Sequence, residues 1–368
     1  MDSSPSYLTP TLPWDQFALD DLAILTHKAH HPKLFKGEFV TEAGESDVPA
    51  PFAKVRPAFK EKPTTTFTFI DLFAGIGGFR VAGQHVMGSC VFTSEWDKYA
   101  RRAYFMNFGE VPFGDITQFT KSTEALDRIP QHDVLCGGFP CQAFSISGKQ
   151  EGFKDPRGTL FFDIARIIKE KRPAAFVLEN VKLLVGHDGG KTLEKILATL
   201  RGMGYHVEYR VLNSLDFGLP QKRERIWIVG LRNSKSFDWP KGGRKMKSLS
   251  EILEKDVPEK FTASDTIQKK RLKRYTPTVA GDLIWHENKA GQISAHPYSC
   301  TLRAGASYNY LLVNGKRRLT PREMLRLQGF PDSFKIACND SQTRKQAGNS
   351  LPVNVAFAVL DQVLATLK

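Results

Sequence analysis

The stretch FTFIDLFAGIGGFR, Phe67 to Arg80, decides the fold. Its first half is a short apolar run of β-forming residues, and three glycines, Gly75, Gly77 and Gly78, follow it. Glycine lets a backbone turn tightly and approach a ligand, so the stretch predicts a strand, a turn and the start of a helix. The spacing Gly-x-Gly-Gly differs from the dinucleotide-binding Gly-x-Gly-x-x-Gly, so a plain strand-to-helix turn stays open as an alternative.

Five further β-rich apolar runs follow, and several alternate with stretches of helical periodicity. The runs are CVFTSEW, DVLCGG, AAFVLEN, HVEYRVLN and RIWIVGL, and LFFDIARIIKE and KTLEKILATLRGMG are helical stretches between them. Strands that alternate with helices of this length predict an α/β fold with a doubly wound, mostly parallel sheet. Ligands bind such sheets at the carboxyl ends of the strands, so side chains there are candidates for chemistry.

Composition divides the chain into three parts. Residues 1–65 carry prolines, mixed charge and WDQFALDDLAILTHKAHH, which is compatible with one amphipathic helix, and we interpret them as an N-terminal extension. Residues 66–230 and 319–368 form the predicted α/β domain, and the helix-like end NSLPVNVAFAVLDQVLATLK is expected to pack back on it. Residues 231–318 lose the strand–helix rhythm and predict a second, smaller domain.

Positive charge is concentrated in the smaller domain. The chain has a net charge of +13, and residues 231–318 hold 18 Lys and Arg against 8 Asp and Glu. Ten of the thirteen net positive charges therefore lie in less than a quarter of the chain. A solvated lysine-rich surface would give the same count, but a polyanion-binding face is favoured because neutralising phosphates releases counterions.

The cysteine pattern and the apolar segments exclude several classes of protein. The five cysteines are scattered, with no Cys-x-x-Cys pair and no Cys/His cluster, so no metal site or disulfide framework is expected. The acidic first thirty residues lack the pattern of a signal peptide, and no segment approaches the ~18 apolar residues that span a bilayer. We therefore expect a cytoplasmic protein without a membrane partner.

Three side chains near predicted strand ends suit an adenosine-containing cofactor. Glu95 lies twenty residues after Gly75 and can accept hydrogen bonds from both hydroxyls of a ribose. Trp96 beside it offers a face for a purine, and Asp115 can read an adenine amino group from the next strand edge. Together they indicate an adenosine-containing cofactor without saying which one.

A cysteine and a glutamate are expected on one rim of the sheet. Cys141 follows the run DVLC, and Glu179 ends AAFVLEN. A thiolate is a nucleophile, and a glutamate at an apolar strand end can have a raised pKa and share a proton. A lone cysteine is often only a buried hydrophobe, which is our interpretation of Cys136. Cys141 differs because it lies past the strand end, between Pro140 and Gln142.

In five segments the chain resembles the cytosine-5 DNA methyltransferases of bacterial restriction–modification systems. DLFAGIGGFR resembles their cofactor loop, GFPCQAFS their Pro-Cys loop, ENV their glutamate motif, QKRERI their arginine motif and QAGNSLPVNV their C-terminal signature. The motifs follow the family order from Phe67 onwards, whereas residues 1–65 are not covered. The resemblance implies a Rossmann-like methyltransferase core, with a target-recognition domain at 231–318.

The resemblance also implies a reaction. S-adenosylmethionine would methylate C5 of a cytosine flipped out of double-stranded DNA. Cys141 would add to C6, Glu179 would bond the ring N3 and the exocyclic amine, and Arg225 would hold O2, with Arg223 nearby on phosphate or protein. The residues implied around the cofactor are Phe73, Gly75, Gly77, Glu95, Trp96, Asp115, Ile116, Leu160, Asn349 and Ser350. The residues implied to contact DNA are Gln142, Ser145, Thr301, Leu302 and Arg303.

The resemblance further implies a monomer in the bacterial cytoplasm, associated with the nucleoid through DNA. A restriction endonuclease would act on the same site without a stable complex. Two alternatives stay open: relatives that methylate cytosine in tRNA share two motifs, but carry Cys-Phe-Thr where this chain has SCTLRAG. A non-catalytic DNA-binding protein on this scaffold would be expected to lose Cys141, Glu179 or Arg225, and all three are present.

Overall fold

A six-stranded sheet forms the centre of the protein in the computed structural model, which describes residues 12–34, 47–60, 62, 64–140, 160–233, 236–276 and 280–368. Its strands are β1 (Phe67–Leu72), β2 (Gly88–Ser94), β3 (Val134–Gly137), β4 (Ala175–Val181), β5 (His206–Asn213) and β7 (Glu224–Leu231). Their order is β2-β1-β3-β4-β7-β5, with the first four parallel and β7 antiparallel to both of its neighbours. The predicted α/β fold with a mostly parallel sheet is confirmed.

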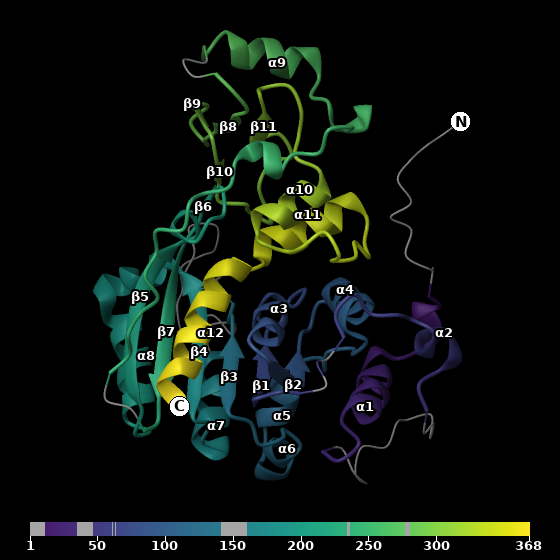
Figure 1. Cartoon of the computed structure of the whole chain (residues 1–368), viewed down its shortest axis with the longest axis vertical. Coiled ribbons are helices and arrows are strands. Elements are labelled where there is room, and N and C mark those ends of the chain that lie inside the picture. Colours follow the sequence, from purple (N-terminus) through teal and green to yellow (C-terminus); the bar gives the residue numbers. More distant parts are fainter. Residues whose placement is uncertain are drawn as a thin grey trace.

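Helices cover both faces of this sheet (Figure 1). Along β1, Phe67 and Phe69 point into one apolar cluster, whereas Ile70 and Leu72 point into the other, as the two-residue period of a strand requires. The first cluster includes side chains of α3 and α12, and the second includes side chains of α7 and α8. The helices packed on the sheet are α3 (Gly78–His85), α4 (Lys98–Phe108), α5 (Thr117–Thr120), α6 (Thr123–Asp127), α7 (Leu160–Lys171), α8 (Lys191–Arg201) and α12 (Val353–Leu367).

The C-terminal helix α12 packs back on the sheet domain, as its apolar pattern predicts. By composition and length, 340–367 is the one candidate membrane span among the described residues. It is two helices, because α11 (Asp340–Asn349) ends before Pro352 and α12 begins at Val353. At 1.5 Å per residue α12 is about 22 Å long, shorter than the ~30 Å hydrocarbon core of a bilayer. Six of its apolar side chains are buried in the protein, so we interpret it as a core helix.

A smaller group of elements lies above the sheet in Figure 1. Its three-stranded sheet has the order β11-β8-β9, and β10 pairs with β6 in a separate two-stranded sheet. A helix begins at Pro321, because proline suits the first helical position, and Thr320 and Glu323 form its capping box. The elements are β6 (Gln221–Lys222), β8 (Ile284–Glu287), β9 (Ile293–His296), β10 (Ser299–Cys300), β11 (Leu311–Val313), α9 (Asp265–Leu272) and α10 (Pro321–Leu327). Short 3-10 helices are η4 (Lys182–Val185), η5 (His187–Gly190), η6 (Ser214–Asp216), η7 (Leu249–Glu251) and η8 (Glu259–Phe261).

The N-terminal extension packs beside the β2 edge of the sheet (Figure 1). Its described elements are the 3-10 helix η1 (Trp14–Gln16), α1 (Leu19–His30) and α2 (Ala50–Ala53). The predicted helix is confirmed from Leu19, but it does not include Trp14, because Phe17 is extended, with φ −132° and ψ 137°. Leu22 and Phe52 are buried in the same apolar cluster as one face of the sheet.

Candidate active site

The residues predicted to carry chemistry gather at the carboxyl ends of β1 to β4. β1 lies between β2 and β3, so the strand order reverses at β1. Such a reversal is the point at which open α/β sheets bind their ligands. The glycine turn follows β1, Glu95 follows β2, and Glu179 lies near the end of β4.

The glycine turn after β1 has the conformation that its glycines predict. Gly75 and Gly77 have φ of 57° and 90°, and Phe73 has φ of 56°, which non-glycine residues rarely adopt. A β-carbon on Gly77 would lie 2.3 Å from the ring of Phe108, so only glycine fits there. A β-carbon on Gly75 would meet no atom within 4 Å. The turn therefore leaves room for a ligand at Gly75.

Glu95 ties the glycine turn to the end of β2. Its Oε2 accepts a hydrogen bond from the Gly75 amide at 2.8 Å, and its Oε1 accepts one from the Asp97 amide at 2.8 Å. Each carboxylate oxygen has a second lone pair, so Glu95 can accept two further hydrogen bonds, such as those of ribose hydroxyls. Burial raises the pKa of Glu95, and the amides of Asp97 and Gly75 oppose that rise. These contacts place the ribose-reading candidate directly against the turn.

The turn that carries Asp115 lies beside the end of β2. The Ser94 hydroxyl donates to the Gly114 carbonyl at 2.8 Å, which fixes this neighbourhood. Trp96 is 80% exposed and Asp115 is also exposed, so both can reach a bound molecule. Ile116 is 2% exposed and packs in the core, so its side chain has little surface left for a cofactor.

The remaining predicted cofactor residues come from distant segments. Asn349 ends α11 and is exposed, whereas Ser350, its C-cap, is 8% exposed. A β-carbon on Gly78 would lie 3.4 Å from the Ser350 hydroxyl oxygen, so the C-terminal motif lies against the glycine turn. Leu160 opens α7 and is half-buried.

Glu179 and Arg225 form an ion pair on the rim of the sheet. Arg225 Nε lies 3.0 Å from Glu179 Oε1, and each side chain is 12% exposed. Antiparallel pairing of β4 with β7 sets Val181 opposite Arg225, which brings the arginine beside the glutamate. Burial raises the pKa of Glu179, and the charges of Arg225 and Arg223 only partly oppose the rise. A carboxyl with a raised pKa can hold or share a proton near neutral pH.

Cys141, Gln142 and Ser145 lie outside the described residues. The chain that leads to Cys141 is described, and it runs beside Glu179. A β-carbon on Gly138 would lie 3.6 Å from Glu179 Oε2, and Asn180 Nδ2 donates to the Phe139 carbonyl at 3.3 Å. Cys136 is fully buried, and burial raises its pKa well above the ordinary value of a thiol, as expected for an unreactive cysteine.

Arg223, expected near the reacting base on phosphate or protein, has its guanidinium buried among backbone carbonyls of the protein. Its Nη1 donates to the Leu302 carbonyl at 2.9 Å, and its Nη2 donates to the carbonyls of Gly348 at 3.2 Å and Ser350 at 2.6 Å. Arg223 is 2% exposed. It therefore joins the recognition-loop candidate to the C-terminal motif.

Sequence reasoning missed the glutamines that complete this joint. Gln221 Nε2 donates to the Leu327 carbonyl at 3.0 Å, and Gln221 Oε1 accepts from the Leu302 amide at 2.9 Å. Gln328 Nε2 donates to the Ser350 carbonyl at 3.2 Å. Both glutamines are fully buried, so their amides must be satisfied internally. The signal that could have revealed Gln221 is its place at the start of QKRERI.

The three candidate DNA-contacting residues of the loop after β10 differ in exposure. Leu302 is 3% exposed, and its amide and carbonyl are both engaged, so its side chain lies in the core and its DNA contact stays a prediction. Thr301 is half-buried, and its hydroxyl donates to the Lys222 carbonyl at 2.8 Å. Arg303 is half-buried, with its guanidinium carbon 4.8 Å from the ring centre of Tyr310.

The sheet order, the glycine turn and the acidic strand ends define a Rossmann-like methyltransferase core. A model of the family described as C-5 cytosine-specific DNA methylase matches residues 67–365. The type II methyltransferase M.NgoBI of Neisseria gonorrhoeae is 56% identical over 294 residues, which cover 78% of this chain and 90% of that protein. M.HaeII of Haemophilus aegyptius is 54% identical, with coverage of 81% and 93%. The chain belongs to the C-5 cytosine-specific DNA methylase family and is a DNA cytosine-5 methyltransferase.

Solved structures share the fold at much lower identity. A putative DNA modification methyltransferase encoded within a prophage of E. coli has a TM-score of 0.63 at 21% identity, covering 82% of this chain and 99% of that chain. The S. pombe Dnmt2 methyltransferase has a TM-score of 0.61 at 20% identity, with coverage of 82% and 100%. The family model begins at Phe67, so the N-terminal extension lies outside it.

Proposed function

We propose that the protein transfers a methyl group from S-adenosylmethionine to C5 of a cytosine within a specific short sequence of double-stranded DNA. Membership of the family supports cytosine in DNA as the substrate, and a methyl donor as the cofactor. The observation that carries the reaction is the Glu179–Arg225 pair at 3.0 Å, beside the residues that lead to Cys141.

The residues at the strand ends fit S-adenosylmethionine. Glu95 has lone pairs left for the ribose hydroxyls, and the exposed indole of Trp96 offers a face to the adenine. Asp115 accepts from the adenine amino group, and Gly75 leaves room for the rest of the molecule. When bound, this cofactor supplies an electrophilic methyl group on a sulfonium sulfur. The set Phe73, Gly77, Leu160, Asn349 and Ser350 completes the proposed surroundings, with Ile116 contributing from the core.

The target cytosine must leave the helix before these side chains can reach it. Stacked neighbours in a duplex block the faces of the cytosine ring, from which a thiolate must approach C6, so the nucleotide is flipped into the rim beside Glu179. The raised pKa of Glu179 lets its carboxyl donate to the ring N3 while it accepts from the exocyclic amine. Arg225 of β7 donates to O2. Arg223, the residue before β7, positions the start of this strand through its bond to the Ser350 carbonyl.

Cys141 supplies the nucleophile in this proposal. Its thiolate forms a bond to C6, the electrons of the C5–C6 double bond shift through C4 to N3, and N3 takes the proton held by Glu179. The resulting enamine makes C5 nucleophilic enough to accept the methyl group, and N3 then returns its proton to Glu179. Loss of the C5 proton to water restores the double bond and breaks the bond between C6 and sulfur, which returns the thiolate.

Binding of DNA rests on the basic region at 231–318. Thr301 and Arg303 are the proposed contacts there, with Gln142 and Ser145 on the segment after Cys141. The type II names of the relatives support a role in restriction–modification, with an endonuclease that cleaves the same site when it is unmethylated. We propose that the protein works as a monomer on DNA in the bacterial cytoplasm.

The test is methyl transfer from radiolabelled S-adenosylmethionine to bacterial DNA and, separately, to tRNA. The expected result is labelled DNA and unlabelled tRNA, with bisulfite sequencing giving one short modified site. Cys141→Ala should lose the transfer, whereas Cys136→Ala, a change of the buried cysteine five residues away, should keep it. Labelled tRNA in place of DNA would contradict the proposal, as would full activity of Cys141→Ala.

A further inference from the structure

The segment 110–114, between α4 and α5, forms a wall beside the proposed adenosine site. Its inner side is bound to the end of β2. The Phe113 amide donates to the Thr93 carbonyl at 2.9 Å, and the Phe113 carbonyl accepts from the Glu95 amide at 2.8 Å. Gly114 is fixed by Ser94, and Asp115 follows at once. The position of this wall therefore sets where Glu95 and Asp115 meet a cofactor.

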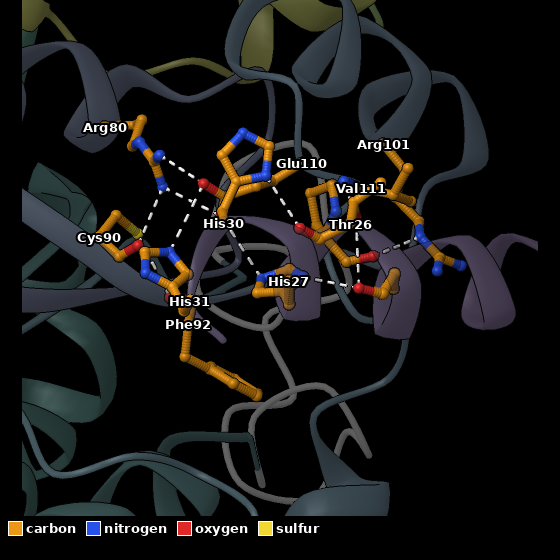
Figure 2. Close-up of polar contacts among 12 residues, drawn as sticks. Thr26, His27, His30, His31, Arg80, Cys90, Phe92, Arg101, Glu110 and Val111 are labelled. Carbon is orange, nitrogen blue, oxygen red and sulfur yellow. Dashed lines mark hydrogen bonds and ion pairs between the residues drawn. The ribbon is translucent and has the colours of Figure 1, made fainter. Parts of the chain in front are cut away.

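The outer side of the same wall is bound to α1 of the N-terminal extension (Figure 2). The Thr26 hydroxyl accepts from the Val111 amide at 3.0 Å and donates to the Leu22 carbonyl at 2.7 Å. The His27 ring lies on Phe113, with 4.4 Å between ring centres. Thr26, His27 and Val111 are all buried, so water does not substitute for these contacts.

A buried charge cluster connects α1, the wall and the helix after the glycine turn. Arg80 of α3 donates to both oxygens of Glu110, at 2.7 Å and 3.4 Å. His27 of α1 and His31, the C-cap residue of that helix, bring a ring nitrogen to within 3.6 Å and 3.7 Å of the same carboxylate. Figure 2 shows the arginine and the two histidines converging on Glu110. The helix after the glycine turn and the N-terminal extension thus both contact the carboxylate of Glu110.

A second contact reaches the wall through Arg101. Its Nε donates to the Pro112 carbonyl at 2.8 Å, and its Nη2 donates to Asp20 of α1 at 2.6 Å. A β-carbon on Gly114 would lie 3.0 Å from the same Asp20 oxygen. Between Glu110 and Gly114, each residue is therefore contacted by α1 directly or through Arg101.

We propose that α1 is a positioning element of the cofactor pocket, with Thr26 and His27 as the positioning residues. By fixing the segment 110–114, α1 holds Glu95 and Asp115 at the spacing that S-adenosylmethionine requires. The inference rests on the proposed cofactor site and goes beyond it, because the family model begins at Phe67 and assigns nothing to α1. The proposal predicts that a change in α1 weakens cofactor binding and leaves the rate of the chemical step unchanged.

The test compares Thr26→Val with two matched variants. Thr26→Val keeps the size of the side chain and removes the acceptor of the Val111 amide, whereas Thr26→Ser restores it. Thr199→Val is the control, because Thr199 also donates to the carbonyl four residues earlier, at 2.8 Å, but sits on an exposed face of α8. The measurements are the Kd of S-adenosylhomocysteine by calorimetry, and KM for cofactor and kcat with saturating DNA.

The expected result for Thr26→Val is a Kd and a KM for cofactor raised about fivefold to tenfold, with kcat within twofold of the wild type. Thr26→Ser and Thr199→Val should match the wild type. Equal cofactor affinity in wild type and Thr26→Val would overturn the inference and leave the proposed function standing. A wild type that binds no S-adenosylhomocysteine would overturn both.

A surface variant keeps the test decisive if Thr26→Val does not fold. The Asp20 side chain is 76% exposed, so Asp20→Asn leaves the core intact and weakens the ion pair with Arg101. The expected result is a Kd for S-adenosylhomocysteine raised about twofold to threefold, because screened surface pairs are weak. A wild-type Kd in this folded variant would overturn the inference.

Discussion

Two buried glutamates, Glu110 beside the N-terminal extension and Glu179 on the rim, are each paired with an arginine, but their pKa values shift in opposite directions. Burial alone would raise the pKa of Glu110, but Arg80, His31 and His27 together hold it well below its ordinary value. Burial raises the pKa of Glu179, and the charges of Arg225, whose Nε lies 3.0 Å from Oε1, and of Arg223 only partly oppose the rise.

The difference follows from the number of donors that surround each carboxylate. Arg80 reaches both oxygens of Glu110 from within the core, whereas Arg223 spends its donors on backbone carbonyls and leaves Glu179 with less compensation. A fully compensated carboxylate stays ionised and holds structure together. A partly compensated carboxylate binds a proton more readily, and proton transfer to the target cytosine requires such a group.

The largest effect is expected at the rim. Glu179→Gln keeps the shape of the side chain but removes the exchangeable proton, so methyl transfer should fall by about 10²-fold to 10⁴-fold. Glu224→Gln is the control, because Glu224 is an exposed neighbour on β7 that pairs with Lys182, and its activity should stay within twofold. Steady-state methylation assays measure both. Retention of more than a tenth of the activity in Glu179→Gln would remove the distinction between the two glutamates.

Glu110→Gln should act on stability instead. It leaves Arg80 buried without its carboxylate, and breaking a buried ion pair costs about 3–5 kcal/mol. We expect the free energy of unfolding in urea to fall by this amount, while kcat of the folded protein at saturating cofactor stays within a few-fold of the wild type. If the free energy of unfolding fell by less than about 1 kcal/mol, the pair of Arg80 and Glu110 would not be a fixed structural ion pair.

Acid should loosen the extension through His27. Burial lowers the pKa of His27 to about 4, although the charge of Glu110 opposes this shift. His31 and Arg80 face His27 in the same cluster, and their charges lower its pKa further. Because this folded pKa lies below the ordinary 6.5, the unfolded chain binds the proton more readily, so stability is full above pH 6.5 and falls towards pH 4. At 1.36 kcal/mol per pKa unit the loss is about 3 kcal/mol.

His27→Gln isolates this contribution. Burial also lowers the pKa of His132 to about 4, and His132 titrates over the same range in both proteins. The measured quantity is therefore the difference in unfolding free energy between wild type and His27→Gln from pH 7 to pH 4. It should shrink as the pH falls, and a constant difference would contradict the prediction.

The smallest effect is expected at a surface pair of equal length. Lys260 Nζ lies 2.7 Å from Asp340, the same distance as Arg80 from Glu110, but the two side chains are 63% and 36% exposed. Lys260→Met should change the unfolding free energy by no more than about 0.5 kcal/mol, because water screens exposed pairs. Urea titration checks this, and a loss near that of Glu110→Gln would mean that distance, not burial, controls the energy.

Local patterns predicted the elements of the sheet domain correctly. The alternation of Phe67, Phe69 and Ile70 specifies a strand buried on both faces, and Pro321 after Thr320 specifies a helix start. Each signal is contained in a few neighbouring residues, so no knowledge of the rest of the chain was needed. The expected places of Glu95 and Glu179 at strand ends followed from the sheet alone.

Contacts between segments that are distant in the sequence could not be predicted from it. The helical period of α1 marks an apolar face, but nothing in it says that Thr26 meets the amide of Val111. The resemblance also did not reveal that Arg223 and Leu302 are both buried at a joint of three segments. Burial of a polar or recognition-loop residue depends on which chain packs over it, and a single sequence pattern does not carry that information.

The most direct test of the account is covalent capture by DNA that carries 5-fluorocytosine in the target site, with S-adenosylmethionine present. Fluorine at C5 prevents the final elimination, so the enzyme should stay attached to the DNA. Peptide mass spectrometry should locate the adduct at Cys141 in the wild type and in Glu110→Gln, and capture should be far slower in Glu179→Gln. An adduct at another cysteine, or equal capture by Glu179→Gln, would contradict the central claim that the rim beside Glu179 is the active site.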